Sequence, residues 1–435
     1  MPHKTQSTSI CVDGYNLAMP QGSGIATYGH TLLEAANGLG LKTQVLYGPS
    51  NPISSIAELN EAEIISGHAK ARKKSVGRAV STYTSRFGIR AYPVVPTGRI
   101  KWPRAGMRQP MADHYWMARE LYHLAHRAYA RSGVFTKVDF SPADGASTPS
   151  AMHWTCPLPL MARRVPNIIT VHDTIPLMLP HSTNDNKAKY YELLDESCHK
   201  ADHILCVSES TKKDLVKIFP DIENKISVTY QPVFSPSPID SEEIASWLKD
   251  ALNLDINDYF LFYGAIEPKK NLGRIVEAYL DSRSQRPLVI VGGRQWLQEH
   301  EVGLLNAHLE QQPDTRIVRL DFLPRSSLDK LIRGARATLF PSLYEGFGLP
   351  VLEAMALGVP VLGSYEGAVA EVGAEAILGV DPYDTGSIAA GIRKLDKDDE
   401  LRRELSLAGK VRAQFFSPSM YSNRIAKIYK DFGLL

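Results

Sequence analysis

The sequence predicts two doubly wound α/β domains. Short apolar runs recur along its 435 residues and alternate with stretches of helical periodicity, which is typical of parallel sheets flanked by helices. At roughly 150 residues per domain, this length suits two or three domains that each bury a core. With 44% hydrophobic and 22% charged residues, the composition excludes a disordered, collagen-like or coiled-coil chain.

The expected strands fall into two groups. They span residues 9–13, 42–47, 167–172, 203–207 and 225–229, and then 259–263, 287–291, 316–320, 337–340 and 359–362. Between the groups, residues 232–238 contain three prolines, a pattern that denies a helix and weakens any strand. We therefore expect an N-terminal domain over residues 1–235 and a C-terminal domain over residues 236–418, facing each other across a cleft.

The last segment, residues 419–435, shows a one-sided helical stripe that must pack on another apolar surface. We expect this helix to lie back across the N-terminal domain. Its stripe consists of Tyr421, Ile425, Ile428, Tyr429 and Phe432.

Targeting and metal-binding signals are absent from the sequence pattern. No stretch approaches 18 consecutive apolar residues, and the first residues lack the apolar core of a signal peptide. The four cysteines form no Cys-x-x-Cys pair, so neither a disulfide framework nor a zinc site is predicted. We expect a cytoplasmic protein that needs no metal.

The charge is unevenly distributed, although the formal net charge is only +2. Residues 64–112 contain eleven Lys or Arg and no Asp or Glu, and the basic segment 70–108 also carries several aromatic side chains. One interpretation is a solvated surface. The other is peripheral contact with the anionic inner face of a membrane, or with a lipid-diphosphate acceptor. Nucleic acid is not an expected partner, because no recognisable nucleic-acid-binding pattern accompanies the segment.

The most informative stretch is residues 337–358, ATLFPSLYEGFGLPVLEAMALG. A buried strand is expected to end at Phe340, and Pro350 suits the start of a helix because its φ is already helical. Gly346 and Gly348 let the backbone approach a ligand, while free N–H groups at the helix start favour an anion. This loop is therefore a candidate phosphate site.

Two glutamates flank that loop. Glu345 and Glu353 would repel a bare phosphate, so sugar and ribose hydroxyls are their expected partners; the plain alternative is a connection with two solvated glutamates. Glu-x7-Glu around Gly-Phe-Gly-Leu-Pro closely resembles the donor-site motif of retaining glycosyltransferases of family four, which have the GT-B fold. The resemblance implies that Glu345 approaches the transferred sugar and Glu353 holds the ribose. It further implies that backbone amides contact phosphate and sugar oxygens at Gly346, Phe347, Gly348 and Leu349.

A second loop follows the first strand of the C-terminal domain, beginning at Gly264. Taken alone, these residues favour a turn with a solvated Lys-Lys pair. It resembles the family's Gly-Arg-x-x-Pro-x-Lys segment, which implies a donor-binding Gly264 and places Lys270 on the diphosphate. Ala265 stands where many members have an arginine, although mannosyltransferase-like branches also lack it and keep Glu-Pro-x-Lys-Asn. Lys269 and Arg294 are the candidates for the missing charge.

The N-terminal domain offers two further candidates. His172 and Asp173 end an expected strand, and His-Asp-x-x-Pro resembles the donor-sugar contact of the family. The alternatives are a structural histidine and an aspartate that caps the following turn. Gly24, in Gly22-Ser-Gly24, resembles the family's first glycine loop, which lies against the diphosphate and the acceptor; a simple strand-to-helix connection is the alternative.

Taken together, the resemblance implies a retaining, metal-independent glycosyltransferase with His172, Lys270 and Glu345 in catalytic positions. It would move a sugar from a nucleotide-sugar to a glycan or lipid-linked saccharide in polysaccharide biosynthesis, without another cofactor, and the short motifs favour GDP-mannose. Two alternatives stay open. One is a GT-B-like sugar-nucleotide epimerase, and the other is a non-catalytic, membrane-associated scaffold with a vestigial site, favoured by Ala265 and the basic segment.

Overall fold

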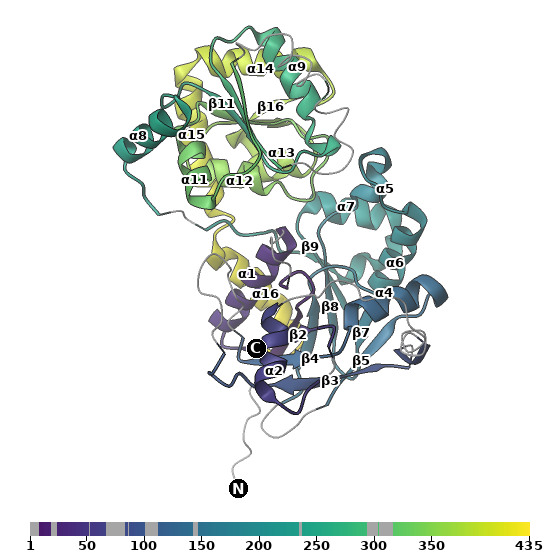
Figure 1. Cartoon of the computed structure of the whole chain (residues 1–435). Helices are drawn as coiled ribbons and strands as arrows, with labels where there is room; N and C mark the ends of the chain where they lie inside the picture. Colours follow the sequence, from purple (N-terminus) through teal and green to yellow (C-terminus); the bar gives the residue numbers. More distant parts are fainter. Residues whose placement is uncertain are drawn as a thin grey trace.

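The computed structural model describes residues 8–18, 24–51, 53–66, 83–85, 87–100, 112–141, 147–234, 237–293, 303 and 316–435. These residues form two α/β lobes, one above the other in Figure 1. The first lobe comprises the elements up to β10 together with the helix α16, and the second contains the elements from α8 to α15.

Within the described residues, the first lobe has a ten-stranded sheet in the order β10-β9-β8-β6-β1-β2-β4-β3-β5-β7. All neighbouring pairs are parallel except β3 and β4. The strands are β1 Ser9–Asp13, β2 Lys42–Tyr47, β3 Ile89–Val94, β4 His114–Met117, β5 Thr136–Phe140, β6 Ala151–Trp154, β7 Leu160–Ala162, β8 Asn167–Val171, β9 His203–Cys206 and β10 Ile226–Val228.

The strands β3 to β7 were not predicted. Four of them are only three to five residues long, too short for a clear period. The fifth, β3, lies inside the basic segment and carries Pro93 and the charged Arg90, both of which weaken a strand pattern.

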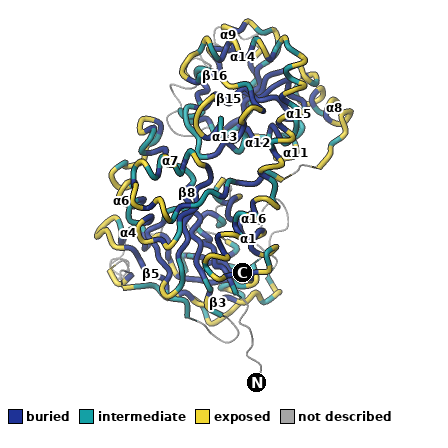
Figure 2. The backbone as a smooth tube through the Cα atoms, turned by 180° about the vertical axis from the view of Figure 1, so that it is seen from behind, coloured by how far each residue is buried: buried dark blue, intermediate teal, exposed yellow. Residues whose placement is uncertain are grey.

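Helices cover both faces of the first sheet, and alternate residues of its strands point to opposite faces. Ile10 and Val12 pack in one core cluster with α1 and α16, whereas Cys11 packs in another with α4, α6 and α7. Figure 2 shows the buried strands between these exposed helices. The helices are α1 Gly24–Gly38, α2 Ala57–Ser66, α4 Leu121–Ser132, α5 Ile175–Met178, α6 Lys187–Lys200, α7 Glu209–Ile218 and α16 Pro418–Asp431.

The second lobe is a parallel sheet in the order β13-β12-β11-β14-β15-β16 as far as the structure is described, with one continuous core. Its strands are β11 Phe260–Tyr263, β12 Leu288–Val291, β13 Ile317–Leu320, β14 Ala337–Phe340, β15 Val361–Ser364 and β16 Leu378–Val380. Its helices are α8 Ser241–Leu252, α9 Leu272–Ser282, α11 Arg325–Gly334, α12 Leu349–Ala356, α13 Gly367–Gly373, α14 Thr385–Lys397 and α15 Asp399–Gln414.

The helix α16 belongs in space to the first lobe. Tyr421, Ile425 and Tyr429 are buried in the same cluster as strand β1 and helix α1, and Figure 1 shows α16 beside α1. The buried His153 ring lies between α16 and the sheet, with Nδ1 3.1 Å from the Tyr429 hydroxyl and Nε2 2.9 Å from that of Thr170.

The two chain crossings between the lobes meet in an aromatic cluster. The Val233 amide donates to the Phe416 carbonyl oxygen at 2.9 Å, joining the outgoing and returning segments. Aromatic rings contact one another there at centroid distances of 5.0–6.3 Å, and two guanidinium groups stack on them. The cluster consists of Tyr230, Phe347, Phe415, Phe416, Arg412 and Arg424.

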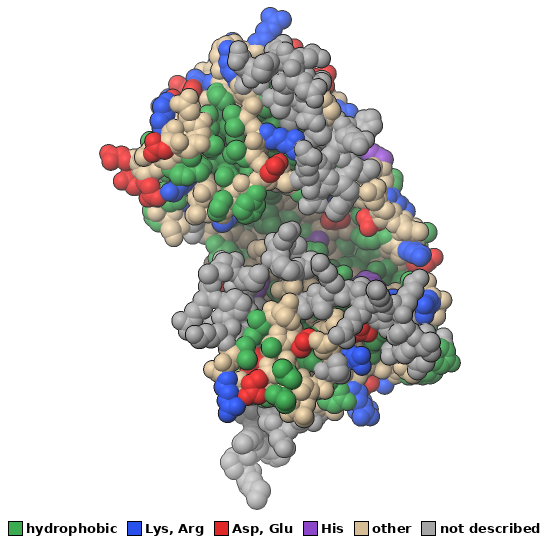
Figure 3. Space-filling model, viewed as in Figure 1, with side chains coloured by type: hydrophobic (Ala, Val, Ile, Leu, Met, Phe, Trp, Pro, Cys, Tyr) green, Lys and Arg blue, Asp and Glu red, His purple; other side chains and the backbone are tan. Residues whose placement is uncertain are grey.

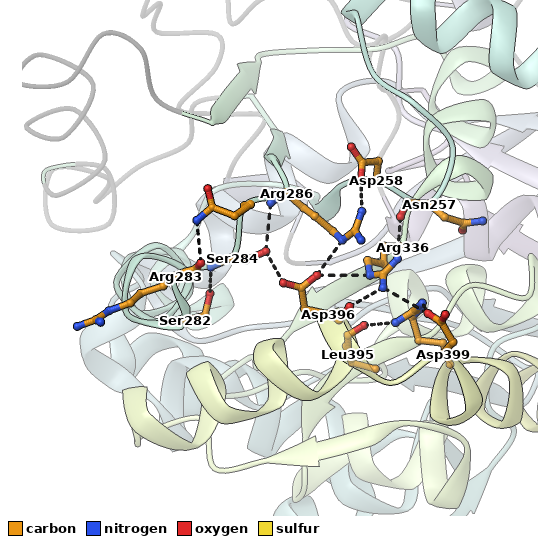
Figure 4. A network of polar contacts seen from close by, with 12 residues as sticks. Asn257, Asp258, Ser282, Arg283, Ser284, Arg286, Arg336, Leu395, Asp396 and Asp399 are labelled. Atoms are coloured by element: carbon orange, nitrogen blue, oxygen red, sulfur yellow. Dashed lines mark hydrogen bonds and ion pairs between the residues drawn. The ribbon is translucent and has the colours of Figure 1, made fainter.

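A polar network links helix α14 to the segments before strands β11, β12 and β14, at the amino-terminal edge of the second lobe's sheet (Figure 4). Asp396 of α14 accepts from Arg286, which precedes β12, at 2.8 Å, and lies near Arg336, which precedes β14. Arg286 also pairs with Asp258, ahead of β11. Because ligands of open α/β sheets bind at the carboxyl ends of the strands, this network lies at the edge opposite the expected site.

Candidate active site

Two loops at the carboxyl ends of neighbouring strands form the base of the site. The first follows β11, and the second follows β14. Asn271 ties them together, since its side-chain amide donates to the carbonyl oxygens of Pro341 at 2.9 Å and Pro382 at 2.7 Å. The Leu343 amide also donates to the Lys269 carbonyl oxygen at 2.7 Å. The loops that carry the predicted lysine and glutamate are therefore held side by side.

Lys270 and Glu345 meet at this junction. Lys270 Nζ lies 2.5 Å from Glu345 Oε1, and the two side chains are only 12% and 10% exposed. Burial alone would raise the pKa of Glu345, but Lys270 and Lys269 outweigh it and hold the pKa below its usual value. Glu345 is thus an ionised carboxylate. It forms an ion pair with the Lys270 ammonium group, which is the group expected to bind a diphosphate.

Lys269 precedes Lys270 in the same loop and interacts with carboxylates of both lobes. Its Nζ is 3.2 Å from Glu267 Oε2. Burial lowers the pKa of Lys269, but Glu345, Asp173 and Glu267 together raise it above its ordinary value, so the side chain stays protonated. Burial raises the pKa of Asp173, and Lys269 only partly offsets this effect. Asp173 Oδ1 also accepts from the Ile175 amide at 3.1 Å, so this side chain caps the turn after β8 as well.

The glycine loop after β14 leads into α12. Gly348 has a φ of 101°, which favours glycine, and Pro350 lies in the first turn of the helix. Among the described residues, the backbone N–H groups of Gly346, Phe347 and Gly348 have no hydrogen-bond partner. They are available to an anion, as the motif predicts. The Phe347 side chain is buried in the aromatic cluster between the lobes.

Gly346 is one of the residues through which the lobes touch. A Cβ on this residue would lie 2.1 Å from the carbonyl oxygen of His172 and 2.9 Å from Asp173 Cβ, so only glycine fits. The contact brings His172 and Asp173 of the first lobe against the loop that carries Glu345. Figure 3 shows the surface hollowed between the two lobes.

His172 is held by residues that no sequence motif selects. Its Nε2–H donates to the Thr155 carbonyl oxygen at 2.8 Å, and the Gln231 side chain donates to Nδ1 at 3.3 Å. Burial lowers the pKa of His172 to about 4, so the ring is neutral. The Tyr28 ring packs edge-on against it at 4.9 Å between centroids. Thr155, Gln231 and Tyr28 lie outside any short motif, which is why sequence reasoning missed them.

Glu353 has a partner of its own. Arg325, at the start of α11, lies 2.8 Å from Glu353 Oε1 and 2.9 Å from Asp329 Oδ1. Burial raises the pKa of Glu353, and Arg325 partly opposes the change. Arg325 is a cation beside the predicted ribose site that the sequence analysis did not select, because a single arginine at a helix start carries no distinguishing pattern.

The remaining candidates are placed as follows. Gly264, with a φ of 132°, opens the loop after β11 and donates to Val291. Gly24 is the first residue of α1 and is exposed, while the residues just before it lie outside the described ranges. Arg294 and most of the basic segment 70–108 also lie outside them.

A cavity of about 250 Å³ opens beside Glu345, on the side of the loop away from β11. It is lined from both lobes, with Ser210 and Asp214 of α7 facing Tyr344, Glu366 and Tyr383. In the part of the chain that the structure describes, no helix is long and apolar enough to cross a bilayer. The same portion contains no group of three metal-ligating side chains.

The two Rossmann-like lobes and the cleft between them define the GT-B class of glycosyltransferases. Solved structures share this fold over nearly the whole chain. The Anabaena protein HepE, in complex with UDP and glucose, has a TM-score of 0.62 at 14% identity, covering 98% of this chain and 100% of that one. Sucrose-phosphate synthase from Thermosynechococcus elongatus has a TM-score of 0.62 at 15% identity, covering 98% of each chain.

Sequence relatives establish the family. Residues 23–233 match the model described as Glycosyltransferase Family 4, and residues 248–412 match that of Glycosyl transferases group 1. The O-antigen chain mannosyltransferase B of Escherichia coli is 30% identical over 60% of this chain and 70% of the relative. The O-antigen chain mannosyltransferase RfbU of Salmonella typhimurium is 29% identical over 53% of this chain and 60% of the relative. The chain belongs to the family-four glycosyltransferases and is similar to their mannosyltransferases.

Proposed function

We propose that this glycosyltransferase moves mannose from GDP-mannose to a saccharide or lipid-linked saccharide acceptor in polysaccharide biosynthesis, with retention of anomeric configuration and without a metal. The observation that carries the proposal is the meeting of Lys270 and Glu345 beside the free amide groups of the glycine loop. The choice of mannose is supported by the names of the similar mannosyltransferases and by the Glu-Pro-x-Lys-Asn pattern without arginine.

The proposed chemistry follows from the charges in the site. The bond between the sugar C1 and the diphosphate oxygen breaks while the acceptor oxygen bonds to C1 on the same face. The acceptor proton passes to the departing diphosphate. Lys270 and the N–H groups of residues 346–348 stabilise the negative charge that develops on that diphosphate, which is the main electrostatic requirement of the step.

The other side chains bind and orient in this proposal. Glu345 lies where it can stabilise positive charge on the transferred sugar, and Glu353 accepts hydrogen bonds from the ribose. Lys269 supplies the second positive charge that Ala265 does not provide. Neutral His172, held by Thr155 and Gln231, forms part of the sugar site beside Gly346.

The test is a calorimetric binding screen of GDP, UDP, ADP and dTDP with the wild type and Glu353→Ala. We expect GDP to bind at micromolar level and Glu353→Ala to lose most of this affinity. Preference for another nucleotide would overturn the choice of donor. A folded protein that binds none of the four would favour the scaffold alternative.

Turnover separates the remaining alternatives. With GDP-mannose and a saccharide acceptor, proton NMR of the product should show the same anomeric configuration as the donor, and prior treatment with EDTA should leave the rate unchanged. An inverted product or loss of activity with EDTA would refute the mechanism. Conversion of the sugar nucleotide without any acceptor would identify an epimerase.

A further inference from the structure

The glycine loop of the second lobe is fastened by two hydroxyl groups of the first lobe. The Gly346 carbonyl oxygen accepts from Ser208 Oγ at 2.6 Å and from Thr211 Oγ1 at 3.1 Å. Both residues are fully buried at the start of α7, Ser208 as its N-cap and Thr211 in its first turn. The Thr211 hydroxyl also lies 3.3 Å from the His172 carbonyl oxygen, within the contact that Gly346 makes with the first lobe.

This fastening sets the direction of one peptide group. Because the peptide bond is planar and trans, the Gly346 carbonyl and the Phe347 N–H point in opposite directions. A carbonyl directed at α7 therefore turns the Phe347 N–H away from α7. Without this fastening, Gly346 would leave the peptide unusually free to rotate.

The first turn of α7 is itself docked on the second lobe. Glu371 of α13 accepts from the Glu209 and Ser210 amides at 2.7 and 2.9 Å, so a carboxylate of one lobe satisfies the helix start of the other. Tyr344 of the β14 loop adds contacts at 3.0 Å to Thr174 and 2.5 Å to Asp214. The two hydroxyl groups are thus presented to Gly346 only when the lobes are together.

We propose that Ser208 and Thr211 are positioning residues for the donor. They orient the Gly346–Phe347 peptide of the opposite lobe so that its N–H, with those of the residues beside it, can bind the diphosphate of the sugar nucleotide. Donor binding then depends on contact between the lobes. The inference rests on the proposed function in that the loop must hold a nucleoside diphosphate.

The test compares GDP with GMP, which lacks the second phosphate, by calorimetry on the full chain. Thr211→Val removes the hydroxyl at nearly constant shape, whereas Thr211→Ser retains it. We expect Thr211→Val to weaken GDP about tenfold, because part of a charge-assisted hydrogen bond is lost. GMP affinity should change less than about twofold in the same variant, and Thr211→Ser should restore GDP binding.

Two further variants keep the result interpretable. Thr338→Val removes another buried hydroxyl, which donates to the Pro360 carbonyl oxygen at 3.4 Å, and should leave GDP binding as in the wild type. Ser208→Ala should repeat the selective loss even where Thr211→Val fails to fold. Equal losses for GDP and GMP, or none, would overturn the positioning role. A wild type that binds no nucleoside diphosphate would instead overturn the proposed function, and this inference with it.

Discussion

Glu345 forms an ion pair with Lys270 in this structure. Removing the charge of Glu345 should therefore tighten nucleotide binding while it slows sugar transfer. The change is Glu345→Gln, which keeps the shape of the side chain. Two anionic oxygens on one ammonium lie about 4 Å apart, and at an effective dielectric of about 20 they repel by about 4 kcal/mol. Because the site opens to the cleft, we expect Glu345→Gln to gain only about 1.4 kcal/mol of this repulsion as GDP binding free energy. This gain corresponds to tenfold tighter GDP binding.

The assay is calorimetric titration of GDP together with the rate of sugar transfer. The pKa of Glu345 lies below its usual value, so Glu345 stays ionised between about pH 6 and 8. The ratio of the GDP dissociation constants of the wild type and Glu345→Gln should therefore stay constant over this range. Glu196→Gln is the matched control, because this carboxylate pairs with Lys200 of α6 at 3.1 Å instead, and it should change GDP affinity less than about threefold. Unchanged or weaker GDP binding by a folded Glu345→Gln protein would refute the reasoning.

Three further predictions test the lobe contact, the buried histidines and the distant polar network. Gly346→Ala places a Cβ 2.1 Å from the His172 carbonyl oxygen. We expect at least tenfold weaker GDP binding, roughly the cost of overpacking, and a larger radius of gyration by X-ray scattering. An unchanged GDP affinity and radius of gyration would contradict the close approach. The pKa of His153 is lowered to about 3 by burial and that of His172 to about 4, so each histidine contributes stability above its unfolded pKa that is lost as the pH falls below it. Between pH 7 and 5, His153→Gln should therefore lose about 2 kcal/mol less unfolding free energy than the wild type in urea titrations, and parallel losses would argue against a neutral buried ring. Arg336→Met should lower the unfolding free energy by about 3 kcal/mol, because the carbonyl oxygens of Asn257 and Asp396 lose a charged donor. It should leave the GDP dissociation constant unchanged, whereas altered GDP binding would place the network within reach of the site.

Much of the fold could be predicted because the relevant signals are local. The strands at residues 9–13, 42–47 and 337–340 coincide with β1, β2 and β14, since each is an apolar run bounded by clear turn or helix signals. Strands β3 to β7, and β16 of the second lobe, were missed because β-strand character depends on cross-strand packing as much as on the segment itself. A short strand such as β7, only three residues long, exists through its neighbour β5.

The candidate site divides in the same way. Glu345, Glu353 and Lys270 belong to compact motifs whose residues are close in sequence, so the pattern was sufficient to select them. Thr155, Gln231, Ser208 and Thr211 act through contacts between segments that are distant in the chain, and Arg325 reaches Glu353 from another helix. Such pairs become visible only when the fold brings them together.

The placement of α16 has a consequence for synthesis on the ribosome. Domains generally fold in the order in which they are translated, but here the first lobe's core includes Tyr421, Ile425 and Tyr429, which are translated after the whole second lobe. Until α16 emerges, Ile10, Val12 and Tyr28 lack part of their apolar cover, and His153 lacks its contact with Tyr429. The first lobe therefore starts to fold first, but its core is completed only after the second lobe has been synthesised.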